Sequence, residues 1–131
     1  MLARLPTGAP VLVVDDEEPV RRTARRVLES AGFDVLVASD GVEGVSVFTE
    51  HRDDMCAVLL NLTMPSMDGV ETFRRLRQLK PDITVILMSG YNEQVAIQRF
   101  TGKGLAGFVQ KPFTVEDLLK QITKVLQGKR D

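Results

Sequence analysis

Residues 58–69 decide the fold, and they read Val58-Leu59-Leu60-Asn61-Leu62-Thr63-Met64-Pro65-Ser66-Met67-Asp68-Gly69. A short apolar run that is closed by proline and then by Asp-Gly predicts a buried strand ending in a sharp turn. In an open parallel sheet, ligands and chemistry gather at the carboxyl ends of the strands. Asn61 is polar and lies near that end, although packing gives a buried strand no reason to hold an amide there. The sequence therefore indicates that this point needs, or once needed, a polar group.

Strand and helix patterns alternate along the rest of the chain. Short apolar or β-branched runs predict strands at residues 10–14, 33–38, 56–62, 83–88 and 105–110. Apolar residues at helical spacing predict helices at residues 19–31, 42–51, 70–80 and 93–100, and a last helix that follows a Thr114 N-cap. Because short loops join five strands to five helices, we expect an α/β fold: a doubly wound, five-stranded parallel sheet with helices on both faces.

The length of 131 residues fits one domain with a sizeable core. Hydrophobic residues make up 44% of the chain and charged residues 27%, which is ordinary for a soluble globular protein. We expect the domain to span residues 10–128, with residues 1–9 as a linker or tail and residues 129–131 as a tail. In the first helix, Arg21, Arg22, Arg25 and Arg26 are expected to face solvent.

Composition argues against several classes of protein. Cys56 is the only cysteine, so the chain can form no internal disulfide and nothing points to an oxidising compartment. No apolar run reaches membrane-spanning length, and the first residues lack the apolar core of a signal peptide. The net charge of −1 and the absence of a basic-aromatic face argue against nucleic-acid binding. We therefore expect a cytoplasmic protein without membrane or nucleic-acid contacts.

Polar side chains follow or end four of the predicted strands. Asp15 and Asp16 come after the first strand, Asn61 lies in the third, Ser89 follows the fourth and Lys111 follows the fifth. All of them are expected at the carboxyl edge of one sheet. Paired carboxylates repel one another unless a hard cation such as Mg²⁺ lies between them. A hydroxyl and an ammonium group are suited to contact phosphoryl oxygens. Each residue alone has an ordinary structural explanation, but the whole set indicates a metal and phosphoryl site.

Four motifs together resemble the receiver domain of two-component response regulators, a CheY-like family. They are Val-Val-Asp-Asp-Glu at 13–17, Leu-Thr-Met-Pro-Ser-Met-Asp-Gly at 62–69, Met-Ser-Gly at 88–90 and Phe-Val-Gln-Lys-Pro-Phe at 108–113. The resemblance covers residues 10–128 and implies a flavodoxin-like sheet with strand order 2-1-3-4-5. The Ser-Gly-Tyr-Asn-Glu-Gln stretch at 89–94 and the run at 102–108 are most similar to receivers of hybrid sensor histidine kinases.

The resemblance implies a role for each matched residue. Asp15 and Asp16 resemble the Mg²⁺-binding acids, with Asp16 as the direct ligand, and the backbone carbonyl of Thr63 resembles the main-chain ligand. Ser89 resembles the hydroxyl that moves toward a phosphoryl group, and Lys111 resembles the lysine that pairs with it.

Two further features follow from the resemblance. The Lys111–Pro112 bond is typically cis in the family. Phe108 resembles the aromatic residue whose rotamer reports activation, although a plain core role explains its residue type equally well.

One position departs from the family pattern. The family's phosphoacceptor is an aspartate, and Asn61 stands in its place. A neutral amide is a very poor nucleophile, and the loss of one negative charge should weaken Mg²⁺ binding, although the amide oxygen could still coordinate. Asn61 is either native, in a receiver that works by docking alone, or an Asp→Asn replacement in an otherwise working receiver. No feature of the sequence supports a shift of the acceptor to Thr63 or Ser66.

The expected function is therefore that of a non-enzymatic receiver module in a phosphorelay, as a monomer or weak dimer. Its partners would be a histidine kinase or a histidine phosphotransfer domain, and its output a change of surface. The alternative is a flavodoxin-like domain that binds a nucleotide or another small molecule. Such a site needs a glycine-rich loop after the first strand, whereas residues 15–19 are acidic and contain proline. A haloacid-dehalogenase-like phosphatase would need a cap for which the chain has no room.

Overall fold

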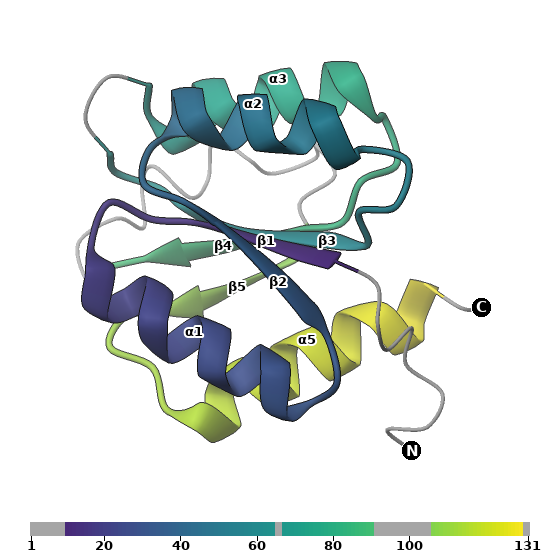
Figure 1. Cartoon of the computed structure of the whole chain (residues 1–131). Coiled ribbons are helices and arrows are strands. Elements are labelled where there is room, and N and C mark those ends of the chain that lie inside the picture. Colours follow the sequence, from purple (N-terminus) through teal and green to yellow (C-terminus); the bar gives the residue numbers. More distant parts are fainter. Residues whose placement is uncertain (1–9, 65–66, 91–105, 130–131) are drawn as a thin grey trace.

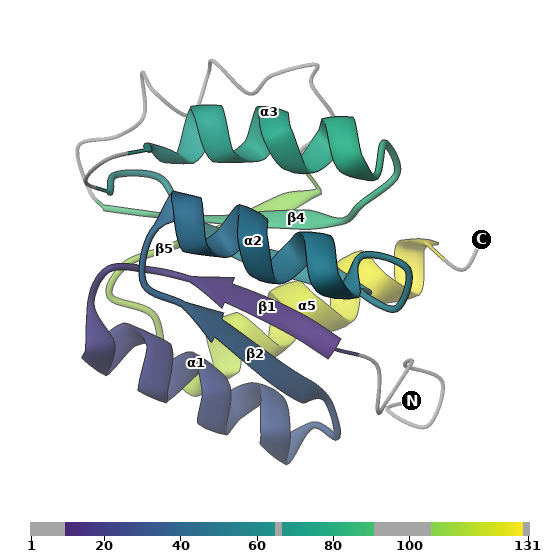
Figure 2. The same cartoon turned by 45° about the horizontal axis from the view of Figure 1, so that its top comes forward.

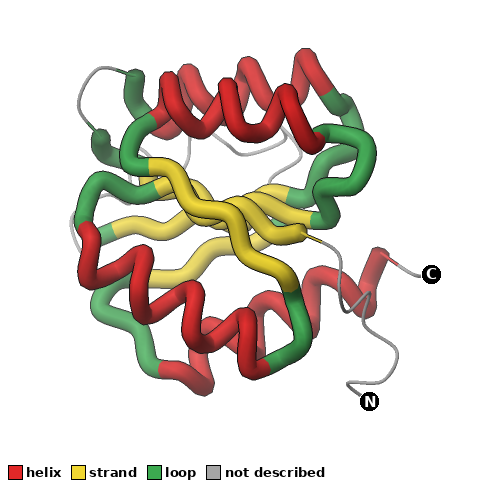
Figure 3. Tube along the Cα trace, viewed as in Figure 1, coloured by secondary structure: helices red, strands yellow, loops and turns green. Residues whose placement is uncertain are grey.

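A computed structural model of the chain describes residues 10–64, 67–90 and 106–129. Five parallel strands form one sheet in the order β2-β1-β3-β4-β5. Figures 1 and 3 show the three layers: α1 and α5 cover one face of the sheet, and α2 and α3 cover the other. The α/β class, the parallel sheet and its strand order are thus confirmed.

The bounds of the elements lie close to the predicted ones. The strands are β1 Pro10–Val14, β2 Asp34–Ala38, β3 Ala57–Asn61, β4 Val85–Ser89 and β5 Gly107–Gln110. The helices are α1 Glu18–Ser30, α2 Gly41–His51, α3 Gly69–Leu79 and α5 Val115–Lys129. The helix predicted at residues 93–100 and the first residue of the strand predicted at 105–110 lie outside the described residues. Ser89 is the last residue of β4 rather than the first residue after it.

The central strand β3 shows why the sheet is buried on both faces. Ala57 and Leu59 pack into the core layer beneath α1 and α5, whereas Val58 and Leu60 pack into the layer beneath α2 and α3. Alternate residues of a strand point to opposite faces, so a continuous apolar run fills two layers at once. Burial of each valine or leucine side chain contributes about 1.5–3 kcal/mol, and the smaller Ala57 contributes less. The two layers fix β3, and with it the position of Asn61.

Helices α2, α3 and α5 each begin at the carboxyl edge of the sheet with a side-chain cap, whereas Glu17 before α1 makes no side-chain cap hydrogen bond. Asp40 and Asp68 accept hydrogen bonds from the backbone N–H groups of Glu43 and Glu71 at the starts of α2 and α3. The predicted cap at Thr114 is confirmed, because its hydroxyl oxygen accepts from the N–H of Asp117 at 3.0 Å. The Asp117 carboxylate accepts from the Thr114 N–H in return.

Gly69 brings the start of α3 against the end of β3. Its N–H donates to the Leu62 carbonyl at 2.7 Å. A Cβ atom at this position would lie 2.7 Å from the Asn61 carbonyl oxygen and 2.8 Å from Leu62 Cα. Only glycine permits this approach of two backbones. The Asp-Gly of the deciding stretch therefore packs the turn against the strand end, and α2 and α3 lie side by side above it (Figure 2).

In the described ranges, no helix combines the length and the apolar character that a bilayer crossing requires.

Candidate functional site

The two acids that follow β1 lie in different surroundings. Asp15 is completely buried, and its N–H donates to the Ala38 carbonyl, so it continues the edge of β1 against β2. Asp16 is exposed. The chain turns toward α1 between them, with Pro19 in the first helical turn. Neighbouring positions of the sequence thus supply one carboxylate inside the protein and one at its surface.

Asp15 is held by three partners. Its Oδ1 accepts the backbone N–H of Glu17 at 2.9 Å, and its Oδ2 lies 2.8 Å from Lys111 Nζ. Its backbone carbonyl accepts a hydrogen bond from Arg21 Nη1 at 2.6 Å. Burial raises the pKa of the Asp15 carboxyl, while the hydrogen bond and charge of Lys111 act in the opposite direction. The buried acid is therefore stabilised chiefly by the ammonium group.

Lys111 lies between β5 and α5, and it reaches back to the loop after β1. Besides Asp15, its Nζ contacts Glu17 Oε1 at 3.2 Å. The side chain of Lys111 is only 16% exposed, whereas that of Glu17 is 60% exposed. The Lys111–Pro112 peptide bond is cis, as the resemblance implies. The lysine thus joins the fifth strand to the first through one buried and one exposed carboxylate.

Asn61 ends β3 and is 5% exposed. Its side-chain nitrogen donates to Asp16 Oδ1 at 3.1 Å and to the Thr63 carbonyl at 2.8 Å. Of the residues predicted to surround a metal ion, Asp16 and the Thr63 carbonyl converge on the amide nitrogen of Asn61, whereas Asp15 pairs with Lys111. No sequence pattern predicts the bond to Asp16, because Asp16 and Asn61 are 45 positions apart.

Ser89 lies one residue beyond Met88, which pairs in register with Asn61 across β3 and β4. Its side chain is 1% exposed, and its Oγ has no hydrogen-bond partner in the part of the chain that the structure describes. Its backbone carbonyl accepts the N–H of Lys111 at 2.6 Å. The structure thus brings Ser89 to the same edge as Asn61 and Lys111, as expected.

Comparison with known protein families decides the identity. A family model described as the response regulator receiver domain matches residues 11–123. The chain belongs to the response-regulator receiver family. The receiver resembles the sensor kinase CckA of Brucella abortus at 35% identity, over 92% of this chain and 13% of CckA. It is 30% identical to sporulation initiation phosphotransferase F of Bacillus subtilis, over 88% of this chain and 92% of that protein.

Solved structures agree on the fold. A receiver domain protein from Clostridium thermocellum superposes with a TM-score of 0.86 at 29% sequence identity. The superposition covers 93% of this receiver and 97% of that chain. The chain is thus a CheY-like receiver, a module of two-component signalling, whereas it spans only a small part of the length of CckA.

Receiver domains generally bind Mg²⁺ at this acidic edge, and the ion needs several oxygen ligands there. Asp15 is paired with Lys111, and the Asp16 and Thr63 oxygens both accept from the Asn61 NH₂ group. Within the described ranges, no three His, Cys, Asp or Glu side chains gather where they could hold a metal ion. A donor group thus faces the oxygens on which a cation would depend, and the residues do not fit the ion well.

Phe108 lies on β5 and is 43% exposed, so a plain core role is wrong for this residue. It pairs in register with Leu87 of β4, two residues before Ser89. Its role as an activation switch stays a prediction.

Two residues of the site were missed or misjudged from the sequence. Glu17 supplies both a backbone donor to Asp15 and a carboxylate to Lys111. Arg21 was expected to face solvent, but it is half-buried and donates to the Asp15 carbonyl. The reason is that the first turn of α1 lies over the end of β1, so Arg21 can reach back to a strand end. The bond joins residues six positions apart, a separation that helical side-chain spacing does not predict.

Proposed function

We propose that this receiver takes part in two-component signalling without accepting a phosphoryl group, because Asn61 occupies the acceptor position. The observation that supports this most directly is the environment of Asn61 at the carboxyl end of β3. A neutral amide lies where the family has a carboxylate, and its nitrogen faces Asp16 and the Thr63 carbonyl. The amide offers no anionic oxygen that could attack phosphorus.

The surrounding residues suit the family's chemistry apart from this position. Ser89 and Lys111 lie at the same edge, and Asp15 holds Lys111 at 2.8 Å. We propose that these groups retain the arrangement of a working receiver, so that Asn61 alone prevents the reaction. Phe108 would then respond to docking rather than to phosphorylation.

A shallow apolar groove beside the site offers a place for a signalling partner. Pro19, Val20, Pro112 and Phe113 line it, and Lys111 borders it. The similarity to a sensor kinase and to a sporulation phosphotransferase supports a histidine kinase or a histidine phosphotransfer domain as the partner. The similarity to CckA also supports an origin in a hybrid kinase, with residues 10–128 as the receiver on the cytoplasmic side.

The test compares the wild-type chain with an Asn61→Asp variant. Both are incubated with a small-molecule phosphodonor and millimolar Mg²⁺, and their intact masses are measured. We expect only the variant to gain the mass of one phosphoryl group, since the carboxylate restores the nucleophile. An Asn61→Asp, Lys111→Met double variant serves as the matched control and should gain much less.

Phosphorylation of the wild-type chain would contradict the proposal, and peptide mapping would then locate the acceptor. If neither chain gains mass, the site has lost more than the nucleophile. In that case the claim that Asn61 alone prevents the reaction is wrong, and docking becomes the whole function.

A further inference from the structure

We propose that the NH₂ group of Asn61 takes the electrostatic place of a divalent cation, so that the acidic edge keeps one arrangement whether or not Mg²⁺ is present. This inference goes beyond the proposed function, because a receiver that accepts no phosphoryl group could still bind the ion. It concerns what stabilises the site rather than what reacts there.

The first support is the number of bonds that one nitrogen makes. Asn61 Nδ2 donates to Asp16 Oδ1 at 3.1 Å and to the Thr63 carbonyl at 2.8 Å. A carboxamide nitrogen carries two hydrogens, so both of its donors are used. The same two oxygens are those that the family resemblance assigns to the metal. A single donor group therefore satisfies the pair of oxygens that a cation would otherwise bridge.

The chemistry of the neighbours explains why the nitrogen faces them. An ionised carboxylate and a backbone carbonyl can only accept hydrogen bonds. The opposite orientation of the amide would place its own oxygen against both acceptors and would leave the buried side chain without these bonds. Asn61 is 5% exposed, so water has little access to compensate. The observed orientation is thus the favourable one in the absence of an ion.

The charges around Asn61 also favour the observed orientation of its amide. Asp15 is buried against Lys111, and these two groups form an ion pair at 2.8 Å. Glu17 shares the same ammonium group, so Asp16 is the carboxylate that contacts Asn61 directly, and it is exposed to water. An aspartate at position 61 would add a second negative charge next to it, and a cation would be needed to offset their repulsion. With the amide, that repulsion is absent.

Binding of Mg²⁺ would require the amide to turn its oxygen toward the ion. The rotation would break both hydrogen bonds of Nδ2 and would supply a neutral ligand in place of a carboxylate. The ion would therefore meet a competing donor and a weaker ligand set. We infer that the wild-type site has little affinity for Mg²⁺ at millimolar concentrations.

The test measures the folding equilibrium constant from urea unfolding, in EDTA and in millimolar Mg²⁺ at matched ionic strength. The wild-type value should change by less than about twofold on addition of Mg²⁺. In EDTA the Asn61→Asp variant should have a folding constant about tenfold lower than the wild type, and Mg²⁺ should restore most of it. A Gln78→Glu variant adds the same charge on an exposed position of α3 and should show no response to Mg²⁺.

A second measurement follows the wild-type chain itself. The side-chain NH₂ signal of Asn61 is followed by nitrogen-15 NMR in the wild-type chain, and it is assigned by its absence in an Asn61→Ala variant. We expect slow hydrogen exchange and an unchanged position as Mg²⁺ is added. A shift of this signal with saturation at millimolar Mg²⁺, or a wild-type folding constant that rises as steeply as that of Asn61→Asp, would overturn the inference.

Neither readout depends on phosphorylation. The mass measurement under the proposed function and these two measurements can therefore fail separately.

Discussion

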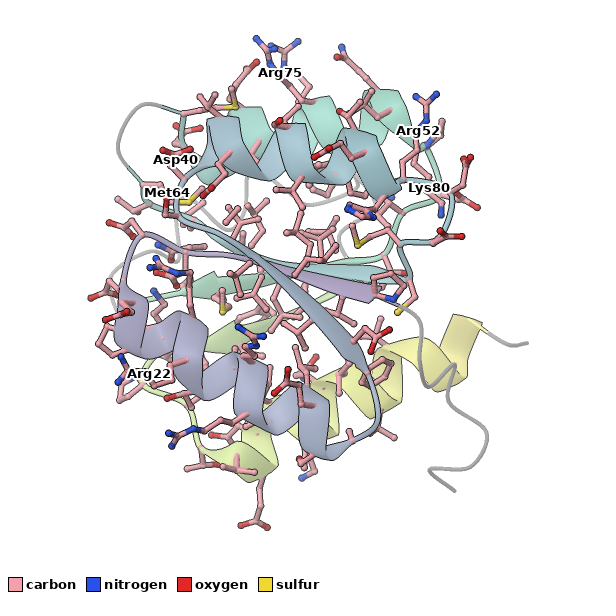
Figure 4. The ribbon with its side chains drawn as sticks, in the orientation of Figure 1. Arg22, Asp40, Arg52, Met64, Arg75 and Lys80 are labelled. Atoms are coloured by element: carbon pink, nitrogen blue, oxygen red, sulfur yellow. The ribbon has the colours of Figure 1, made fainter. Side chains whose placement is uncertain are left out.

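The two ends of the sheet each hold a lysine that contacts two acceptors, but the acceptors differ in charge. At the carboxyl edge, Lys111 contacts the carboxylates of Asp15 and Glu17. At the opposite end, Lys80 donates to the backbone carbonyls of Arg52 and Met55 at 2.9 and 3.0 Å. Figure 4 shows Lys80 and Arg52 at this second end, well away from Asp40 and Met64 near the carboxyl edge.

The difference in acceptor charge means that the two lysines have different roles. Lys80 makes a structural contact, whereas Lys111 neutralises a buried charge, that of Asp15. A neutral carbonyl that loses its lysine donor loses a hydrogen bond but leaves no unpaired charge. Without Lys111, Asp15 would hold a completely buried charge without its ammonium partner. The carboxyl edge therefore depends on individual charged groups, whereas the other end depends on hydrogen bonds to neutral acceptors. Lys111→Met and Lys80→Met test this contrast directly, and Gly69→Ala and Glu71→Gln set it against a backbone contact and an exposed ion pair, in order of decreasing effect.

The largest effect is expected for Lys111→Met, which leaves the Asp15 charge buried without its ammonium partner. The free energy of unfolding at neutral pH should fall by about 2–3 kcal/mol, somewhat less than for a fully buried pair because Lys111 is 16% exposed. Urea unfolding measures it. Glu17→Gln removes only the exposed contact of the same lysine and should cost less than about 0.5 kcal/mol. Equal losses in the two variants would refute the distinction between the buried and the exposed contact.

Gly69→Ala should come next, because it forces a Cβ atom against backbone at the end of β3. The nearest atoms are the Asn61 carbonyl oxygen at 2.7 Å and Leu62 Cα at 2.8 Å. We expect a loss of about 1–3 kcal/mol in the free energy of unfolding. Gly44→Ala is the matched control in α2, since the atoms nearest its Cβ belong to the Val14 side chain, at 3.0 Å and beyond, and not to backbone. The comparison fails if thermal unfolding ranks the two variants in the opposite order.

Lys80→Met tests the other end of the sheet and should have a smaller effect than Lys111→Met. It removes two hydrogen bonds to neutral carbonyls and leaves no charge unpaired, so the free energy of unfolding should fall by about 0.5–1.5 kcal/mol. Urea unfolding is again the measurement. If the free energy of unfolding fell as much as in Lys111→Met, the charge of the acceptors would not determine how much each lysine stabilises the fold.

The smallest effect concerns the exposed ion pairs of Glu71 near the start of α3. Hydrogen bonds from Arg74 and then Arg75 lower the pKa of Glu71 below its ordinary value of 4.5. A carboxyl whose pKa is lower in the folded state contributes stability above 4.5, and this contribution is lost as the pH falls through the folded-state pKa. The stability difference between wild type and Glu71→Gln should therefore shrink below pH 4.5. It should also shrink with added salt. If the stability difference between wild type and Glu71→Gln grew on acidification, the Glu71 pKa would not be lowered by folding.

Much of this molecule could be predicted because its signals are local. The apolar run before Asn61 predicted β3, and Asp-Gly predicted the turn before α3. The Thr114 cap with Asp117 predicted the start of α5, and the structure contains both of its hydrogen bonds. The fourth predicted helix, at residues 93–100, lies outside the described residues.

The site was predicted only as a set of residues at one sheet edge. Parallel strands place their carboxyl ends together, so the meeting of Asp15, Asn61 and Lys111 followed from the strand pattern. Arg21 was misjudged because helical spacing gives the direction of a side chain relative to its own helix, and not what lies above the first turn.

The sequence by itself determined the strand and helix order, the apolar layers and the residue types at the carboxyl edge, because these depend on spacing along the chain. Only the tertiary structure decided which acid is buried and which oxygens the Asn61 amide meets. Those outcomes depend on how β1, β3 and the loop before α5 approach one another. Lys111 and Asp15, for example, are far apart in sequence but 2.8 Å apart in space. Burial and pairing, which set the charge balance of the site, arise only when such distant segments pack together.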